Sequence, residues 1–427
     1  MKIQFFLGFL LVAVTVIGQS DFENVMIHQY SGSGYQPCEP SIAVDVTNPS
    51  KVVAGSILNN VYTSLDSGRT WTLDVLESDL GVFGDPCIIS SPKGGFYYFH
   101  LSDPDHKGWR SDKLLDRIVC QYSKDVNKKW SKGSGMGLNG SKDQDKEWAV
   151  TSLDGKKVYC TWTQFDKYNS KEEGDSTLIL FSMAKHKGKK WSEPVRISAM
   201  GGDCLDGDMT VEGAVPSVGP EGELYVAWAL DDQIWLDRSF DGGQTWLEQD
   251  IKGPKIPGGW DHSIEGIGRA NGMPVTKVDV SKGEHRGRIY INWADDRNGA
   301  NDVDVWLAYS DDHGNTWSES VRVNDDAAGS QQFFTWMDVD PITGQVVCVF
   351  YDRRNYSDYR TDVYLAVSND GGQTFENIRV SEAPFTPSDK VFFGDYNNVS
   401  AVNGVVRPIW TRNDNGVLSV WTALINL

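Results

Sequence analysis

Ser239-Phe-Asp241-Gly-Gly243-Gln-Thr245-Trp246 is one of four copies of the phrase S-x-D-x-G-x-T-W/F in this chain. The other copies begin at Ser64, Ser310 and Ser368. Each copy predicts a hairpin turn, because the Asp side chain caps the turn, the Gly adopts a positive φ, and the last two residues begin the next strand. Spacings that are multiples of roughly 55–70 residues suit the four-stranded blades of a β-propeller.

The number of blades follows from weaker copies of the same turn. Residues 123–130 keep the Ser, Asp and Trp of the phrase, and residues 182–191 form a stretched version, which makes six turns. Residues 396–426 contain three more strands without the phrase, and we expect the segment 24–30 to supply the missing outer strand. The sequence therefore predicts an all-β propeller of seven blades, with six as the alternative. Residues 102–116 and 247–271 are predicted to be insertions.

The first residues resemble a secretory signal peptide, with one lysine, an apolar run from 5 to 17 and a small residue before Gln19. We therefore expect residues 1–18 to be removed, residues 19–427 to form one propeller domain, and the protein to be secreted or periplasmic. The apolar run is too short to span a bilayer. A net charge of −19 argues against a nucleic-acid partner, and we expect a monomer.

The six cysteines could be paired in disulfides or remain free thiols. An exported chain with six cysteines can form up to three disulfides, and a Cys38–Cys87 bridge is one candidate. Most of the cysteines fall within apolar strand patterns, which favours buried free thiols. Nothing resembles the spacing of zinc ligands, and we expect no metal or cofactor, with calcium as the alternative. The cysteines are Cys38, Cys87, Cys120, Cys160, Cys204 and Cys348.

Acidic residues tend to precede the innermost strand of a blade, where they should face the mouth of the central channel, opposite the repeated turns. Clustered carboxylates raise one another's pKa, which suits general acid and base catalysis, and they also suit calcium or loop hydrogen bonds. In the fifth and sixth blades the equivalent places hold Arg269, Asn271 and the aromatic residues Phe333, Phe334 and Trp336. The acids are Glu39, Asp85, Glu147, Glu212 and Asp395.

Three arginines follow the second strand of the last three blades, namely Arg297, Arg353 and Arg412. Because equivalent loops of repeated blades lie on one face of a propeller, we expect these arginines on the same face as the acids. Converging guanidinium groups bind a carboxylate well, because each planar fork donates two matched hydrogen bonds. The alternative is that each arginine pairs with a local aspartate or caps a turn.

The four repeated phrases resemble the Asp-box repeats of the sialidase-like superfamily, and the blade pattern covers nearly all of residues 19–427. The resemblance implies a carboxylate-binding arginine triad, for which Arg297, Arg353 and Arg412 are the candidates. It also implies a tyrosine nucleophile assisted by a glutamate, here Tyr396 and Glu212. Asp85 is the implied acid/base, with Glu147 next. The F/Y-R-I-P motif of sialidases is absent, and CEPSI stands in its place.

These features favour a carbohydrate-active enzyme, namely an exo-acting glycoside hydrolase that releases an acidic sugar such as sialic acid. One alternative is a polysaccharide lyase in which Tyr396 or His262 removes a proton from a uronate. The other is a propeller that binds a glycan or a protein without cutting it. An acidic glycan is the expected partner.

Overall fold

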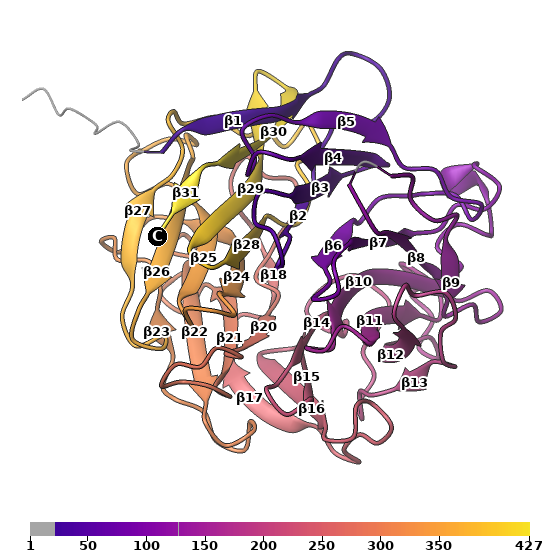
Figure 1. Ribbon diagram of the computed structural model, residues 1–427. Helices are drawn as coiled ribbons and strands as arrows, with labels where there is room; N and C mark the ends of the chain where they lie inside the picture. The colour runs from indigo at the N-terminus through magenta and orange to yellow at the C-terminus, as the bar shows by residue number, and fades with distance from the viewer. Residues whose placement is uncertain (1–21, 127) are drawn as a thin grey trace, which may run out of the picture.

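A computed structural model of the chain describes residues 22–126 and 128–427. The predicted signal peptide, residues 1–18, lies outside this part. Seven sheets are arranged around a central channel as the blades of a propeller (Figure 1), so the prediction of seven blades is confirmed. In the described ranges no helix is long and apolar enough to cross a membrane.

Each of the first six blades consists of four antiparallel strands in sequence order, the first of which lines the channel. Blade 1 contains β2 (Ser41–Val44), β3 (Val52–Ser56), β4 (Asn60–Ser64) and β5 (Thr72–Val75). Blade 2 contains β6 (Cys87–Ser90), β7 (Phe96–Leu101), β8 (Ile118–Ser123) and β9 (Ser134–Met136). Blade 3 contains β10 (Asp143–Thr151), β11 (Lys157–Phe165), β12 (Thr177–Lys185) and β13 (Val195–Arg196). Blade 4 contains β14 (Glu212–Val218), β15 (Leu224–Leu230), β16 (Gln233–Ser239) and β17 (Ile251–Lys255).

Blades 5 and 6 repeat this order, and blade 7 takes its outer strand from the N-terminal segment. Blade 5 contains β20 (Val275–Val278), β21 (Ile289–Asp295), β22 (Asp304–Ser310) and β23 (Val321–Arg322). Blade 6 contains β24 (Gln332–Val339), β25 (Val346–Asp352), β26 (Asp362–Ser368) and β27 (Glu376–Arg379). Blade 7 contains β28 (Asn398–Val402), β29 (Val405–Asp414), β30 (Val417–Ala423) and the N-terminal strand β1 (Asn24–Gln29), while β31 (Ile425–Asn426) pairs with β29.

The two ends of the chain close the ring, as predicted. β1 pairs antiparallel with β30, with Asn24 opposite Ala423 and Gln29 opposite Ser419. Figure 1 shows β1 beside β30 on the outside of blade 7. The pairing covers an edge of β30 that would otherwise present unpaired backbone groups to solvent.

The repeated turns adopt the expected geometry. In the first copy the Asp66 carboxylate accepts hydrogen bonds from the Thr70 amide (2.9 Å) and hydroxyl (2.6 Å), and the Ser64 hydroxyl accepts one from the Gly68 amide (2.8 Å). The glycine in the 239–246 copy, Gly243, has φ = 88°. A Cβ there would also lie 2.4 Å from the Phe181 ring of the preceding blade, so the glycine permits both the turn and the contact between blades. Asn127 of the weaker second turn lies outside the described residues.

The core lies between neighbouring blades. A buried tryptophan lies in the second strand of four blades, and these are Trp162, Trp228, Trp293 and Trp410. All six cysteines are buried free thiols, so the structure contains no Cys38–Cys87 bridge in the part of the chain that it describes.

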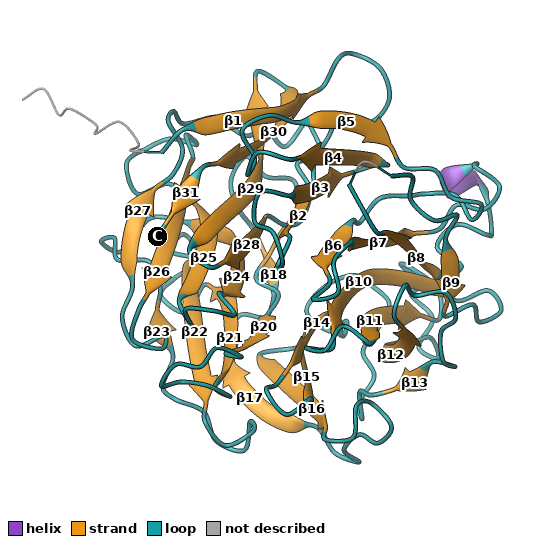
Figure 2. Ribbon diagram, viewed as in Figure 1, coloured by secondary structure: helices purple, strands orange, loops and turns teal. Residues whose placement is uncertain are grey.

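The first predicted insertion, and the part of the second that follows Lys255, lie at the face opposite the repeated turns. The first, residues 102–116, contains the short 3-10 helix η1 (Gly108–Arg110), which Figure 2 shows at the edge of the molecule. The second contains β17, an outer strand of blade 4, and a small hairpin of β18 (Asp261–His262) and β19 (Ala270–Asn271). This hairpin carries Arg269 toward the channel.

Candidate functional site

A cavity of about 570 Å³ occupies the channel mouth on the face opposite the repeated turns. Residues just before or at the start of the inner strands of blades 1 to 4 line it, together with both insertions and the segment that leads into blade 7. Six carboxyl groups and three cationic groups line the cavity, and these are Glu39, Asp85, Asp145, Asp206, Glu212, Asp389, Lys146, Arg269 and Lys390. Three of the five predicted acids and one of the predicted arginines are therefore brought together.

A left-handed backbone residue places a side chain at the mouth in each of the first three blades. Glu39, Asp85 and Lys146 have φ of 53°, 50° and 53°. Glu39 and Asp85 lie two residues before the first paired residue of their inner strands, and Lys146 lies two residues before Trp148, where the pairing of β10 resumes after a shift. Non-glycine residues rarely adopt this conformation, and such strain concentrates at functional sites. In blade 3 the position belongs to Lys146, because the pairing of β10 shifts between Asp145 and Trp148.

Lys146 and Arg269 form the charged centre of the site. The ammonium nitrogen of Lys146 lies 3.6 Å from Asp85 and 3.4 Å from Asp395. Arg269 Nε donates a hydrogen bond of 2.9 Å to Asp395, and its Nη1 donates one of 2.7 Å to Asp206. Burial raises the pKa of Asp395, but Lys146 and Arg269 outweigh it and lower that pKa to about 2. Asp395 is thus an ionised anchor for both cations and does not itself line the cavity.

Asp145 was not among the predicted site residues. It is near the start of β10 and lines the cavity. Burial, with the negative charges of Asp85 and Asp206 added, raises its pKa to about 7, although Lys146 opposes the shift. A carboxyl that titrates near neutral pH suits a general acid. The run DQDKEW shows several acids in this place, but it gives no sign of which one faces the cavity.

Glu212 and Glu147 are both buried carboxyls with incomplete hydrogen bonding. Glu212 lines the cavity, and its Oε2 has no hydrogen-bond partner. Glu147 has no partner for either oxygen and is not among the described residues that line the cavity. Burial raises the pKa of both groups. The negative charge of Asp206 raises the pKa of Glu212 further, and that of Asp85 does the same for Glu147.

Three aromatic residues close the channel beneath the cavity. The ring centroids of Trp148 and Trp336 are 4.3 Å apart, and Tyr396 packs edge-on against Trp148 at 5.1 Å. The two tryptophans also line a second cavity of about 220 Å³ at the opposite mouth, bounded by the inner strands of all seven blades. Tyr396 and Asp395 line a small space between the two cavities. The predicted nucleophile Tyr396 therefore lies one layer below the floor formed by Lys146, and its hydroxyl has no hydrogen-bond partner.

The three arginines that were expected to converge at the channel mouth do not meet at this cavity. Arg297, Arg353 and Arg412 are not among the described residues that line the cavity. Arg297 pairs with Asp295 at 2.5 Å, and Arg412 pairs with Asp414 at 2.6 Å. These contacts are the local pairing that the sequence left as the alternative.

Arg353 is buried on different partners. Its guanidinium donates hydrogen bonds to Gln331 (3.0 Å), Thr361 (3.2 Å) and the carbonyl of Glu265 (2.8 Å). Burial lowers its pKa to about 10. His262 also has a structural contact, with its Nε2 3.0 Å from the carbonyl oxygen of Ala294.

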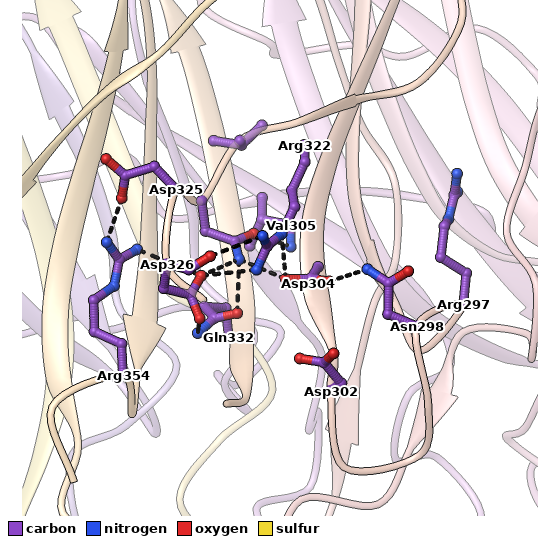
Figure 3. Close-up of polar contacts among 12 residues, drawn as sticks. Arg297, Asn298, Asp302, Asp304, Val305, Arg322, Asp325, Asp326, Gln332 and Arg354 are labelled. Carbon is purple, nitrogen blue, oxygen red and sulfur yellow. Dashed lines mark hydrogen bonds and ion pairs between the residues drawn. The ribbon is translucent and has the colours of Figure 1, made fainter. Parts of the chain in front are cut away.

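A separate polar network joins blades 5 and 6 (Figure 3). Asp304 accepts hydrogen bonds from Arg322 (2.7 Å), Asn324 (2.5 Å) and Asn298 (2.6 Å). Arg322 also pairs with Asp326 at 3.0 Å. In Figure 3 the guanidinium of Arg297 points away from this network. The charges here are paired with one another and serve the contact between blades.

Aromatic side chains form the rim of the cavity. Trp109, in the first insertion, is 67% exposed and packs edge-on against Phe83, with ring centroids 5.8 Å apart. Tyr168 lies 6.0 Å from the Trp109 ring and donates a hydrogen bond of 2.5 Å to Asp206. Phe392 is exposed at the other side. Exposed rings above a polar cavity can stack on sugar rings, whose C–H faces are apolar.

No group of three or more His, Cys, Asp or Glu side chains within residues 22–126 and 128–427 is arranged to hold a metal ion. In the acidic cluster the ammonium of Lys146 lies between Asp85 and Asp395.

A family model described as a BNR repeat-like domain matches residues 156–391, which is more than half of the chain. The chain belongs to the BNR repeat-like family. The resemblance to sialidase-like repeat propellers is therefore confirmed.

Solved structures share the propeller of this BNR repeat-like protein. An ulvan lyase of polysaccharide lyase family PL25, bound to -[GlcA(1-4)Rha3S]-, has a TM-score of 0.55 at 12% identity, covering 93% of this chain and 96% of that one. A protein of unknown function from Dyadobacter fermentans gives 0.52 at 12% identity, with coverages of 95% and 98%. A mutant of the NanB sialidase from Streptococcus pneumoniae gives 0.51 at 11% identity, with coverages of 80% and 68%. At these identities the likeness concerns the fold.

The acidic cavity predicts how the stability of this BNR repeat-like propeller depends on pH. Burial raises the pKa of Glu39, Glu147 and Glu212, and that of Asp145 rises from 3.8 to about 7. At a pH between the ordinary pKa of such a group and its raised pKa, the folded chain binds more protons than the unfolded chain. The free energy of unfolding therefore falls as pH rises through this range. We expect the melting temperature to drop by several degrees from about pH 5 to about pH 8.

The control for this experiment is Glu212→Gln, which should show a shallower decline because it removes one of the groups with a raised pKa. A melting temperature that is constant or rises over this range would contradict the assignment of raised pKa values to the cluster.

Proposed function

We propose that the protein is an exo-acting glycoside hydrolase. The observation that carries this proposal is Asp145, a carboxyl group with a pKa near 7 in a cavity rimmed by aromatic rings. Trp148 and Trp336 close the channel beneath the cavity. A site that is closed below accepts the end of a glycan rather than the middle of a chain, which supports exo action.

The roles of the residues follow from their charges. Asp145 would donate its proton to the glycosidic oxygen as the bond from that oxygen to the anomeric carbon breaks. Asp206 accepts hydrogen bonds from Tyr168 and Arg269 and contributes to the raised pKa of Asp145. Asp206 would stabilise the positive charge that develops on the sugar ring and accept the proton of the attacking water. Asp85 is held by Lys146, and Tyr396 lies below the floor.

The acidic sugar expected from the sequence is a finer proposal. It depended on Arg297, Arg353 and Arg412, which have other partners. Arg269 remains as a cation in the cavity, but its guanidinium already donates hydrogen bonds to Asp395 and Asp206. Export, proposed from residues 1–18, would give the enzyme access to extracellular glycans.

A polysaccharide lyase is the second candidate, because Tyr168 and Arg269 lie together in the cavity, 3.4 Å apart. A lyase needs a base that removes a proton and a cation that neutralises a uronate. Burial and the charge of Asp206 raise the pKa of Tyr168. Proton abstraction by this tyrosine is therefore less favoured than proton donation by Asp145.

The experiment is an assay of the purified chain on a panel of neutral, amino, sialic acid and uronate glycans, read by mass spectrometry and ultraviolet absorbance. Release of a terminal sugar without new absorbance supports the hydrolase. An absorbing unsaturated product would establish the lyase instead. If no glycan in the panel is cut, the hydrolase proposal fails and the propeller is better explained as a binding module.

A further inference from the structure

We propose that the cavity recognises a sugar that carries a protonated amino group. This inference rests on the proposed function, because it names the class of sugar that the same cavity binds. It is carried by the balance of charge in the cavity, by one unpaired buried oxygen and by the aromatic rim.

The charge balance favours a cationic ligand. Six carboxyl groups line the cavity, against three cations. Lys146 is paired with Asp85 and Asp395, and Arg269 with Asp206 and Asp395. These two cations are therefore already neutralised by acids of the site, whereas Lys390, the third cation, forms no ion pair among the described residues. Four of the carboxyl groups, Glu39, Asp145, Glu212 and Asp389, form no ion pair with a cation among the described residues. An ammonium group on the ligand could pair with them and would favour their ionised form, whereas a carboxylate on the ligand could not.

Glu212 supplies an acceptor that nothing in the structure uses. Its side chain is 1% exposed, it lines the cavity, and Oε2 has no hydrogen-bond partner. A buried acceptor without a partner is costly, so a ligand that donates to it gains free energy. An ammonium group offers three donors and a positive charge, whereas a hydroxyl offers one donor and no charge.

The charged groups that act on Glu212 are Asp206, Lys146, Asp145 and Arg269. Burial and the two aspartates raise the pKa of Glu212, which the two cations oppose. A bound ammonium group would lower that pKa again, so part of the Glu212 population would release its proton on binding. A neutral sugar would cause little release.

The rim adds faces suited to such a ligand. Trp109 and Phe392 are exposed rings that line the cavity. Aromatic faces attract cations as well as the apolar faces of sugars. The first insertion carries Trp109 and the chain before blade 7 carries Phe392, so rings flank the acidic floor from two segments.

The test is calorimetric titration of the wild-type chain with methyl glycosides, which as monosaccharide derivatives resemble the bound chain end. The probes are glucosamine, N-acetylglucosamine and glucuronic acid, each with its galacto counterpart. We expect at least one amino sugar to bind about tenfold tighter than its acetylated form, as one charge-assisted hydrogen bond allows. The preference should shrink as salt is added, and titrations in two buffers should reveal proton release only for the amino sugar.

Glu212→Gln should abolish most of this preference while leaving binding of the acetylated sugar nearly unchanged. The matched control is Asp74→Asn, on the exposed outer strand β5, which should leave the preference intact. Equal or tighter binding of the acetylated or acidic sugars, or no binding of either amino sugar, would overturn the inference. Hydrolysis of a neutral glycan in the panel would then leave the proposed function standing.

Discussion

Asp145→Asn is expected to lower kcat/KM on the cleaved glycan by about 10²–10⁴-fold, the contribution typical of a general acid. The substitution keeps the shape of the side chain and removes the proton that the leaving oxygen needs. Because Asp145 is buried among other acids and its pKa is raised to about 7, loss of its charge should leave the melting temperature equal or higher. The measurement combines steady-state kinetics with thermal unfolding.

The pH profile separates this role from a structural one. With Asp145 as the acid, wild-type activity should fall as pH rises through about 7. Asp143→Asn is the matched control, since Asp143 lies on the same strand and its carboxylate accepts a hydrogen bond from the Tyr168 amide (2.8 Å). This control should retain most of the activity. Full turnover by the Asp145→Asn enzyme would remove Asp145 from the mechanism.

Asp304→Ala is expected to cause the largest loss of stability, about 3–5 kcal/mol, because it removes a buried carboxylate that pairs with Arg322 and leaves that cation with Asp326 alone. Asp304 is 0% exposed and accepts hydrogen bonds from Arg322, Asn324 and Asn298. Figure 3 shows Arg322 and Asn298 directed toward Asp304. Urea unfolding of the variant and the wild type measures the difference.

Asp325→Ala provides the control within the same network. The Asp325 side chain is 56% exposed and pairs with Arg354. A solvent-exposed ion pair contributes only about 0–1 kcal/mol, so this variant should unfold almost as the wild type does. If both variants lose the same small amount, Asp304 does not hold the two blades together in the way proposed.

Local features of the sequence were sufficient for the fold. The phrase around Asp66 and its copies forms turns through hydrogen bonds within a few residues, so the turns can be recognised without knowledge of the rest of the chain. Their spacing gave the blade size, and the strand pattern of residues 396–426 showed that an outer strand was missing. The pairing of β1 with β30 confirms that inference.

The sequence also determined the face of the site and several of its residues, because repeat geometry places every residue before an inner strand at the same mouth. Glu39, Asp85, Glu212 and Arg269 line the cavity for this reason.

Only the tertiary structure decided which groups do the chemistry. A shift of pairing in β10 puts Asp145 and Lys146 at the cavity in place of Glu147, and one residue of register changes the direction of every side chain. The same holds for the arginines, since whether Arg297 meets a ligand or Asp295 depends on side-chain contacts in space. Burial and neighbouring charge, which set the pKa of Asp145, likewise exist only once distant segments are packed together.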